Sequence, residues 1–303
     1  MKILNLFERY FSIALVGILA VSCVDEPVTP PGTTEGIDSV KTPVIAPPIV
    51  YDNSIFSIPS PIQLSSIIAN NGAAFDAEML NKPNKSDVYV TTESQALNLG
   101  IYGADLGYTS LYDHQQEALK YMKASKKLAD MLGISEAFDE ASISEIERNL
   151  DNKDSLLFLI SNSYRRADEF LQVRNRKHIG ALIIVGGWIE SLYFASNIGK
   201  TGDTYNKEFA ELIGNQKHTL EIILDKMLIK YIDKPGIEDL YMDLESIRES
   251  FEEVNIEYVF VKPVHNKENK VTEINSTSSV DISHEVLKEI SNKIALLRKK
   301  IIL

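Results

Sequence analysis

One segment near the middle of the chain, residues 179–198, most strongly constrains the fold. It is twenty residues long, carries one charged side chain, Glu190, and is apolar on every side. A helix of this kind must be buried on all sides, either in a membrane or among other helices. Its length would span a bilayer, which needs about 20 residues. Its three glycines and the polar Ser191, Ser196 and Asn197 favour a central helix covered by other helices.

The segments that could cover this helix are apolar on one face only. In each of them apolar residues recur every three or four positions, as in a helix with one buried face. The clearest stripes are Leu157, Ile160, Tyr164, Ala167 and Leu171; Phe209, Ile213, Leu220, Ile223 and Met227; Ile237, Leu240, Leu244, Ile247, Phe251 and Val254; and Val286, Ile290, Ile294, Leu297 and Ile301. Further helices are predicted over about 92–112 and 113–132. Because one-faced helices need partners, the sequence predicts an all-α domain, built as a multi-helix bundle or an αα-superhelix.

One stretch departs from the helical pattern. Residues 256–261 alternate in polarity and are rich in β-branched and aromatic side chains, and a polar turn separates them from residues 271–274. This pattern predicts one small β-hairpin near 256–275. Because a two-stranded hairpin is only marginally stable alone, we expect it to lie against the helices.

Two glycine-containing helices resemble each other in sequence. Residues 96–108 and 181–193 align at an offset of 85 residues, which indicates an internal duplication. Glycine in a helix interior costs about 1 kcal/mol relative to alanine, so two helices that accept this cost are expected to approach each other closely. We expect Gly103 and Gly187 to lie where the helices meet.

The same two helices carry the acids Asp105 and Glu190 in apolar surroundings. A buried carboxylate is costly unless it is paired or hydrogen-bonded. In one interpretation, Asp105, Tyr108, Trp188 and Glu190 form a ligand cleft between the helices. In the other, which we favour, the acids are structural and are satisfied inside the core. Their partners would be tyrosine hydroxyls, Asn98, Arg165 or Arg166.

Residues that could bind a metal or perform catalysis form no complete motif. The chain has no His-Glu-x-x-His, no Gly-x-Ser-x-Gly and no pair of cysteines. Two His-x-x-Glu pairs, His114 with Glu117 and His218 with Glu221, place a histidine and a carboxylate on one helix face. Di-metal bundles use the reverse order, Glu-x-x-His, so solvated helix faces are the favoured interpretation. We therefore expect no metal and no cofactor, and the sequence favours a protein that is not an enzyme.

The N-terminal residues carry a targeting pattern. A basic start is followed by an apolar run over residues 10–19, then by small residues and Cys23. This order is typical of a secretory signal. It resembles a bacterial lipoprotein signal with its lipobox, although Leu19 stands four residues before the cysteine instead of the usual three. The resemblance implies cleavage after residue 22 and attachment of lipid, including palmitate, to Cys23, the only cysteine in the chain.

The predicted organisation has three parts. Residues 1–22 form the signal peptide, residues 23–53 the lipidated cysteine and a linker, and residues 54–303 the helical domain. The linker holds six of the eleven prolines of the chain. Proline-rich linkers are extended and act as semi-rigid spacers, so we expect the domain to be held away from the membrane.

The helical region also resembles a known set of proteins. Residues 58–108, with the run ALNLGIYGADLGY at 96–108, are similar to helical envelope lipoproteins of Gram-negative bacteria without assigned activity. The resemblance implies a recurring fold and transfers no catalytic residue.

These observations predict a lipid-anchored protein of the cell envelope, in the outer membrane on its periplasmic or surface face. It would be a non-catalytic binding or structural module for a protein, a glycan or a small ligand. The alternative is an enzyme or a metal-binding protein that uses the acidic and aromatic cleft. Nucleic acid is not an expected partner, because the net charge of −12 repels phosphate backbones.

Overall fold

The computed structural model describes residues 49–51, 54–56, 72–138, 140–149, 174–202, 204–266, 271–273 and 275–303, and scattered positions between 152 and 171. These residues belong to one compact unit, Pro43–Leu303. The other unit, Met1–Thr42, lies outside the described residues, and so do the predicted signal peptide and Cys23.

The described part of this unit is mostly helical, in agreement with the predicted all-α class. Its longest helices are α2 (Thr92–Leu111), α3 (Gln115–Met131), α6 (Lys177–Ile198), α9 (Ile237–Phe251) and α10 (His284–Ile302). Shorter elements are α4 (Glu140–Arg148), α7 (Lys207–Gly214), α8 (Gln216–Ile222), the π-helix η4 (Ile223–Leu228), and the 3-10 helices η1 (Ala77–Met79), η2 (Pro83–Asp87), η3 (Ser135–Phe138) and η5 (Ile229–Tyr231). The apolar stripe predicted over 209–227 is therefore divided among α7, α8 and η4.

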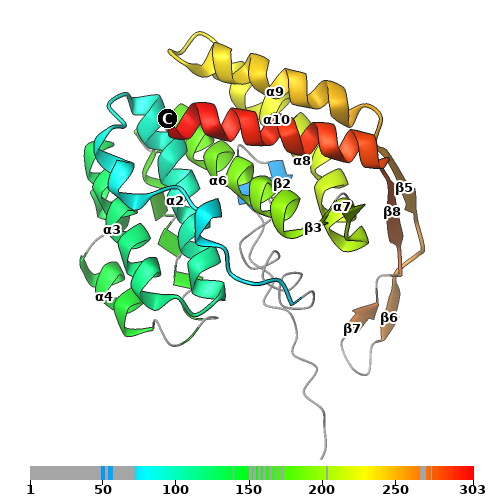
Figure 1. The fold of residues 1–303 in the computed structure, drawn as a ribbon, viewed down its shortest axis with the longest axis horizontal. Coiled ribbons are helices and arrows are strands. Elements are labelled where there is room, and N and C mark those ends of the chain that lie inside the picture. The colour runs from blue at the N-terminus through cyan, green and yellow to red at the C-terminus, as the bar shows by residue number, and fades with distance from the viewer. Residues whose placement is uncertain are drawn as a thin grey trace, which may run out of the picture. The chain divides into compact units, whose positions relative to one another are not determined.

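Helix α6 lies at the centre of these elements (Figure 1). Both α2 and α10 pack against α6, α3 packs against α2, and α9 packs against α10. Among the described residues, α6 is the one helix long and apolar enough to cross a membrane, and 83% of its most apolar 18-residue window is buried inside the structure. This burial agrees with the expectation of a central helix covered by other helices.

Helices α2 and α6 run parallel and touch through their backbones. A Cβ atom at Gly100 would lie 2.0 Å from the carbonyl oxygen of Ile183, and one at Gly186 would lie 2.0 Å from the carbonyl oxygen of Leu97. A shift of 86 residues relates the two contacts, because it takes Gly100 to Gly186 and Leu97 to Ile183. This shift is one residue more than the predicted offset of 85. A Cβ atom at Gly187 would lie 3.4 Å from its nearest neighbour, the Gly100 carbonyl oxygen, which is an ordinary contact distance. The closest approach on α6 is therefore at Gly186, whereas we expected it at Gly187.

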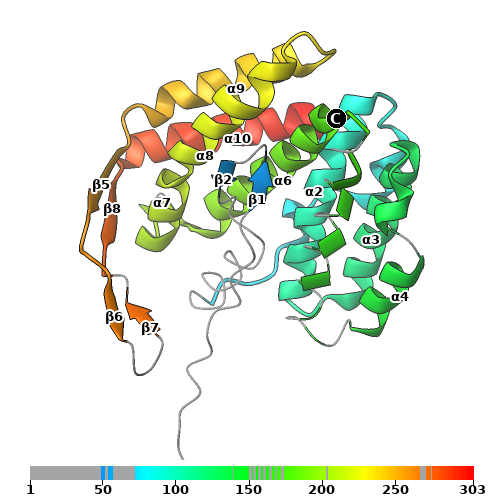
Figure 2. The same ribbon diagram turned by 180° about the vertical axis from the view of Figure 1, so that it is seen from behind.

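The strands form small antiparallel pairs. Strand β1 (Ile49–Tyr51) pairs with β2 (Ser54–Phe56), β3 (Lys200–Thr201) with β4 (Thr204–Tyr205), β5 (Asn255–Val259) with β8 (Thr277–Asp281), and β6 (Val264–Asn266) with β7 (Val271–Glu273). The last four strands form one long hairpin that extends from the helices (Figure 2).

This hairpin confirms the predicted small β element but not its pairing. The strand that begins at Asn255 pairs with residues 277–281, whereas the prediction paired it with residues 271–274. The inner ladder ends at the pair of Val259 with Thr277, and the outer ladder begins at the pair of Val264 with Glu273. Ser276 bridges the gap, because its hydroxyl accepts from the Val261 N–H at 3.0 Å and donates to the Val261 carbonyl at 3.1 Å.

Candidate functional site

Two acids and one arginine meet in the interior of the unit. Asp105 on α2 and Glu190 on α6 are both 0% exposed, and Arg298 on α10 is also buried. The guanidinium of Arg298 donates from Nε to Glu190 Oε2 at 2.5 Å and from Nη2 to Glu190 Oε1 at 2.7 Å. A two-pronged arginine–carboxylate contact of this kind fixes geometry as well as charge. We call Asp105, Glu190 and Arg298 the buried charge cluster.

The guanidinium of Arg298 makes two further contacts. Its Nη2 also donates to the carbonyl of Met79 at 2.6 Å, and its guanidinium carbon lies 4.1 Å from the ring centroid of Tyr193. A cation over an aromatic face gains further electrostatic stabilisation. Arg298 therefore joins α10 to α6 and to the segment before α2.

The end of α10 is held by polar side chains from the same region. Its last carbonyls lack partners within the helix, as at any helix C-terminus. Asn98 Nδ2 donates to the Ile301 carbonyl at 3.1 Å, and Lys85 Nζ donates to the Ile302 carbonyl at 2.8 Å. The hydroxyl of Tyr89 adds a longer bond of 3.4 Å to Ile302. These bonds fix the helix one turn beyond Arg298.

The cluster contains two acids and a single guanidinium. Within the described residues, no donor lies in hydrogen-bonding geometry with either carboxyl oxygen of Asp105. Burial raises the pKa of Asp105 well above its usual range, and the charge of Glu190 raises it further. Burial also raises the pKa of Glu190, whereas Arg298 opposes that rise. We infer that Asp105 is protonated and that Glu190 is the ionised partner of Arg298.

At Asp105, the interaction between the two acids acts in the same direction as burial. Contact with Glu190 raises the pKa of Asp105, and contact with Asp105 lowers the pKa of Glu190. The proximity of the two carboxyl groups thus favours the neutral form of Asp105 and the ionised form of Glu190. In this state the cluster has one negative and one positive charge, so no net charge is buried.

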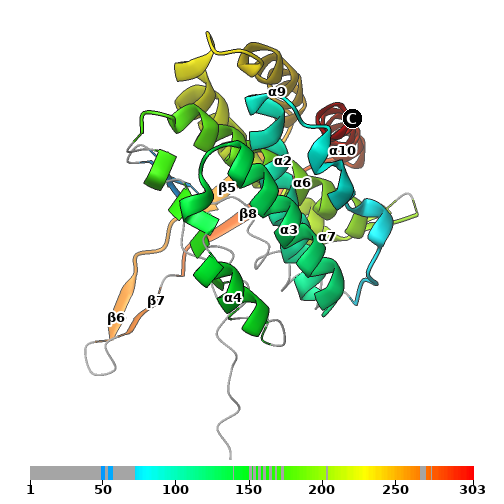
Figure 3. The same cartoon turned by 90° about the vertical axis from the view of Figure 1, so that its left-hand side faces the viewer.

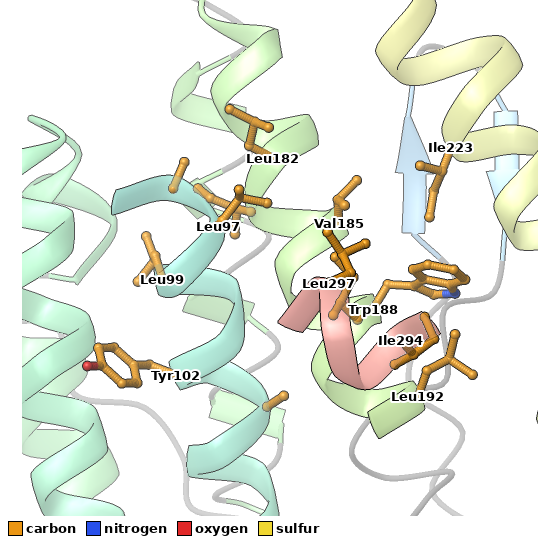
Figure 4. Close-up of a cluster of buried hydrophobic side chains, with 14 of the residues drawn as sticks. Leu97, Leu99, Tyr102, Leu182, Val185, Trp188, Leu192, Ile223, Ile294 and Leu297 are labelled. Carbon is orange, nitrogen blue, oxygen red and sulfur yellow. The ribbon is translucent and has the colours of Figure 1, made fainter. Parts of the chain in front are cut away.

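The two aromatic residues of the predicted cleft belong to other parts of the core. Trp188 points away from α2 towards Ile223 (Figure 4), and its indole N–H donates to Gln216 Oε1 at 3.2 Å. Tyr108 stacks on Phe194 with ring centroids 4.7 Å apart, and its hydroxyl accepts from the Asp76 N–H. Both side chains are buried. The structure thus brings Asp105 and Glu190 together but places Trp188 on a different face of α6.

The four candidate metal ligands have local partners. His114 stacks on Phe75 with centroids 3.8 Å apart, and Glu117 pairs with Lys120 at 2.6 Å. His218 Nδ1 lies 3.1 Å from Glu221 Oε2 on an exposed face of α8. In the part of the chain that the structure describes, no group of three or more His, Cys, Asp or Glu side chains could hold a metal ion.

Arg298 is the functional residue that sequence reasoning missed. Of the arginines named as partners for the acids, Arg165 lies outside the described residues, and Arg166 donates to the Glu136 carbonyl. A signal for Arg298 was available, because it follows Ile294 by four positions and so continues the buried stripe of α10. A charged residue in an apolar stripe is a candidate partner for a buried charge elsewhere.

Comparison with known proteins adds no relative. No family model matches the chain, and neither the curated proteins nor the solved structures contain a match.

Proposed function

We propose that this chain is a lipid-anchored, non-catalytic protein of the cell envelope, with a helical domain that acts as a binding or structural module. The observation that carries the non-catalytic part is the burial of the acids. Asp105 and Glu190 have no exposed surface, and Glu190 is bound to Arg298 by two hydrogen bonds. Acids in this state stabilise packing between helices, whereas a catalytic pair must reach a substrate.

The anchor is proposed from the N-terminal sequence. The lipobox-like residues before Cys23 and the absence of any other cysteine in the chain support lipidation of Cys23. The proline-rich linker over residues 24–53 supports a domain held away from the membrane. We place the protein at the outer membrane, with a protein, a glycan or a small molecule as the partner of its domain.

The anchor is tested by expressing the full chain in a Gram-negative host with labelled palmitate. The wild type should incorporate label and have the mass of a chain that starts at Cys23. Cys23→Ser should lack label and keep the mass of the uncleaved precursor. Ser22→Ala, which keeps a small residue before the cysteine, should be processed like the wild type. Equal labelling and equal mass in Cys23→Ser and wild type would refute the anchor.

The alternative function, an enzyme or a metal-binding protein, has less support. It requires the acids to face a cleft, and both lie in the closed interior. Elemental analysis of the dialysed protein tests the metal-binding form directly. Stoichiometric zinc, iron or manganese that is lost in a His114→Ala/His218→Ala double variant would establish that form and displace our proposal.

The finer architecture is also a proposal. We infer that the helices form a bundle around α6 and that α2 and α6 derive from an internal duplication. The equivalent contacts at Gly100 and Gly186 support this inference. A close parallel crossing of two unrelated helices would give the same local symmetry. Related sequences in which 96–108 and 181–193 align at a constant offset would separate the two origins.

A further inference from the structure

The long hairpin exposes apolar side chains beyond the point where it contacts the helices. At its root, Ile256 and Val280 are paired and partly buried, and Val280 packs closely on Gly214 at the end of α7. Farther along, Tyr258 is 65% exposed, Val259 58% and Phe260 68%. Figure 3 shows the outer strands β6 and β7 extending away from the helices. We call the residues 258–266 and Val271 the hairpin finger.

The finger exposes apolar side chains on both of its faces. Consecutive residues of a strand point to opposite faces, so Tyr258 and Val259 occupy different sides of the ribbon. Both are exposed, as are Val261, Val264 and Val271. A flat protein partner would cover one face of such a ribbon and leave the other in water. An apolar medium into which the finger inserts would cover both.

The finger also differs in charge from the rest of the chain. The whole chain has a net charge of −12, whereas residues 260–272 contain three lysines, one histidine and one glutamate. Lys262 and His265 are exposed within the described part of the finger. The strands from Asn255 to Asn266 extend over roughly 35 Å at about 3.3 Å per residue. This length exceeds the screening length of about 8 Å in physiological salt, so the finger can approach an anionic surface that repels the helices.

We propose that the hairpin finger inserts into an anionic lipid surface. Aromatic and aliphatic side chains would enter the boundary between headgroups and acyl chains, and Lys262 would contact lipid phosphates. The bonds between Ser276 and Val261 join the two sides of the hairpin within the finger. The contact is additional to the lipid on Cys23 and would orient the domain relative to the membrane. It therefore rests on the proposed envelope location.

The test uses the chain from residue 24 to residue 303, which lacks the signal and the anchor. The residues removed belong to the unit Met1–Thr42, whereas the buried core of the described residues begins at Met79. Vesicles of phosphatidylglycerol and phosphatidylethanolamine should bind this protein in a sedimentation assay, and phosphatidylcholine vesicles should bind it weakly. Binding should fall as salt increases. Phe260→Ser should lower the partition coefficient about tenfold, because it removes a large apolar side chain from the lipid.

Leu296→Ser is the matched control, because Leu296 is 67% exposed but lies on α10. It should bind vesicles like the wild type. Phe260→Trp provides an independent readout, since its added fluorescence should shift to the blue with anionic vesicles while buried Trp188 stays unchanged. No binding to anionic vesicles, or equal loss in Phe260→Ser and Leu296→Ser, would overturn the proposal. Association of the protein with itself that depends on Phe260, without vesicle binding, would also overturn it in favour of a second copy.

Because the protein used here has no lipid, this test can fail while the anchor experiment succeeds. The reverse outcome, vesicle binding by the finger without palmitate on Cys23, would leave the finger in place and refute the anchor. The two proposals are therefore tested separately.

Discussion

The centre of the helical unit and the hairpin finger depart from the usual distribution of side chains in opposite ways. The centre buries three ionisable groups, Asp105, Glu190 and Arg298, where apolar residues are the norm. The finger exposes Tyr258 and Phe260 where polar residues are the norm. In the centre every charge has a partner inside the molecule. On the finger these apolar side chains are exposed among the described residues, which is why we assign stability to the first region and binding to the second.

The largest expected effect on stability comes from removing the positive charge of the buried charge cluster. Arg298→Met should lower the free energy of unfolding by about 3–5 kcal/mol, because it leaves Glu190 charged and buried without a partner. Urea denaturation of the purified domain measures this. Lys300→Met is the control on the same helix, since Lys300 pairs with Asp243 at 2.5 Å on the surface. It should cost at most about 1 kcal/mol. Equal losses would mean that the buried cluster contributes no more than a surface ion pair.

A smaller effect is expected at the contact of α2 and α6. Gly186→Ala should destabilise the domain by about 1–3 kcal/mol, because its methyl group would collide with the Leu97 carbonyl. Gly187→Ala is the adjacent control, with its nearest atom at 3.4 Å. It should be neutral or stabilise by up to about 1 kcal/mol, since alanine favours the helix. Thermal melting of both variants measures the difference, and a stabilised Gly186→Ala would refute the close approach.

The next effect depends on pH. The pKa of Asp105 is raised in the folded protein. Its contribution to the free energy of unfolding is therefore fully present below the unfolded pKa of about 4, and it is lost as the pH rises towards the folded pKa. Asp105→Asn removes this loss. Its stability relative to the wild type should increase with pH by at most about 1.4 kcal/mol per pH unit.

The phenol groups near Asp105 should not obscure this trend. Burial raises the pKa of Tyr89, Tyr102 and Tyr121, so these phenols remain protonated through neutral pH. Denaturation curves between pH 5 and pH 9 measure the trend, with the surface variant Asp243→Asn as the control. A constant difference between Asp105→Asn and wild type would show that Asp105 is ionised in the folded protein.

The smallest effect on stability is expected on the finger. Phe260→Ser should change the free energy of unfolding by less than about 0.5 kcal/mol, since exposed side chains contribute little to folding. The same variant should lose vesicle binding, whereas Arg298→Met should keep binding wherever it remains folded. Melting curves and sedimentation on the same samples compare the two regions. A large loss of stability in Phe260→Ser would mean that the finger is part of the folded core.

Periodicity in the sequence predicted the helices and the buried position of α6, because one-faced stripes and an apolar segment permit few arrangements. It also located the hairpin near 256–275. The pairing of β5 with β8 could not be predicted from the same pattern. It depends on a gap between the two ladders, where the Ser276 side chain bonds to the backbone of Val261, and no residue period encodes such a bond.

The buried charge cluster was predictable only in part. Asp105 and Glu190 stood out as acids in apolar helices, and their burial follows from that setting. Their partner is distant in sequence, since Arg298 is 108 residues from Glu190. The position of α10 against α6 decides this contact, and one sequence does not specify which helices become neighbours. The sequence offset that aligned Asp105 with Glu190 was 85 residues. The contacts at Gly100 and Gly186 are related by a shift of 86 residues, so the two differ by one.

The protonation state of Asp105 tests the central claim most directly. If the centre is a closed and neutral structural cluster, Asp105 is a carboxylic acid at pH 7. The infrared difference spectrum between wild type and Asp105→Asn should then contain the carbonyl stretch of one protonated carboxyl group, which the variant lacks. A difference spectrum with only carboxylate bands would contradict the account. It would show two carboxylates beside one guanidinium, and so a net buried charge that a further cation or solvent must compensate.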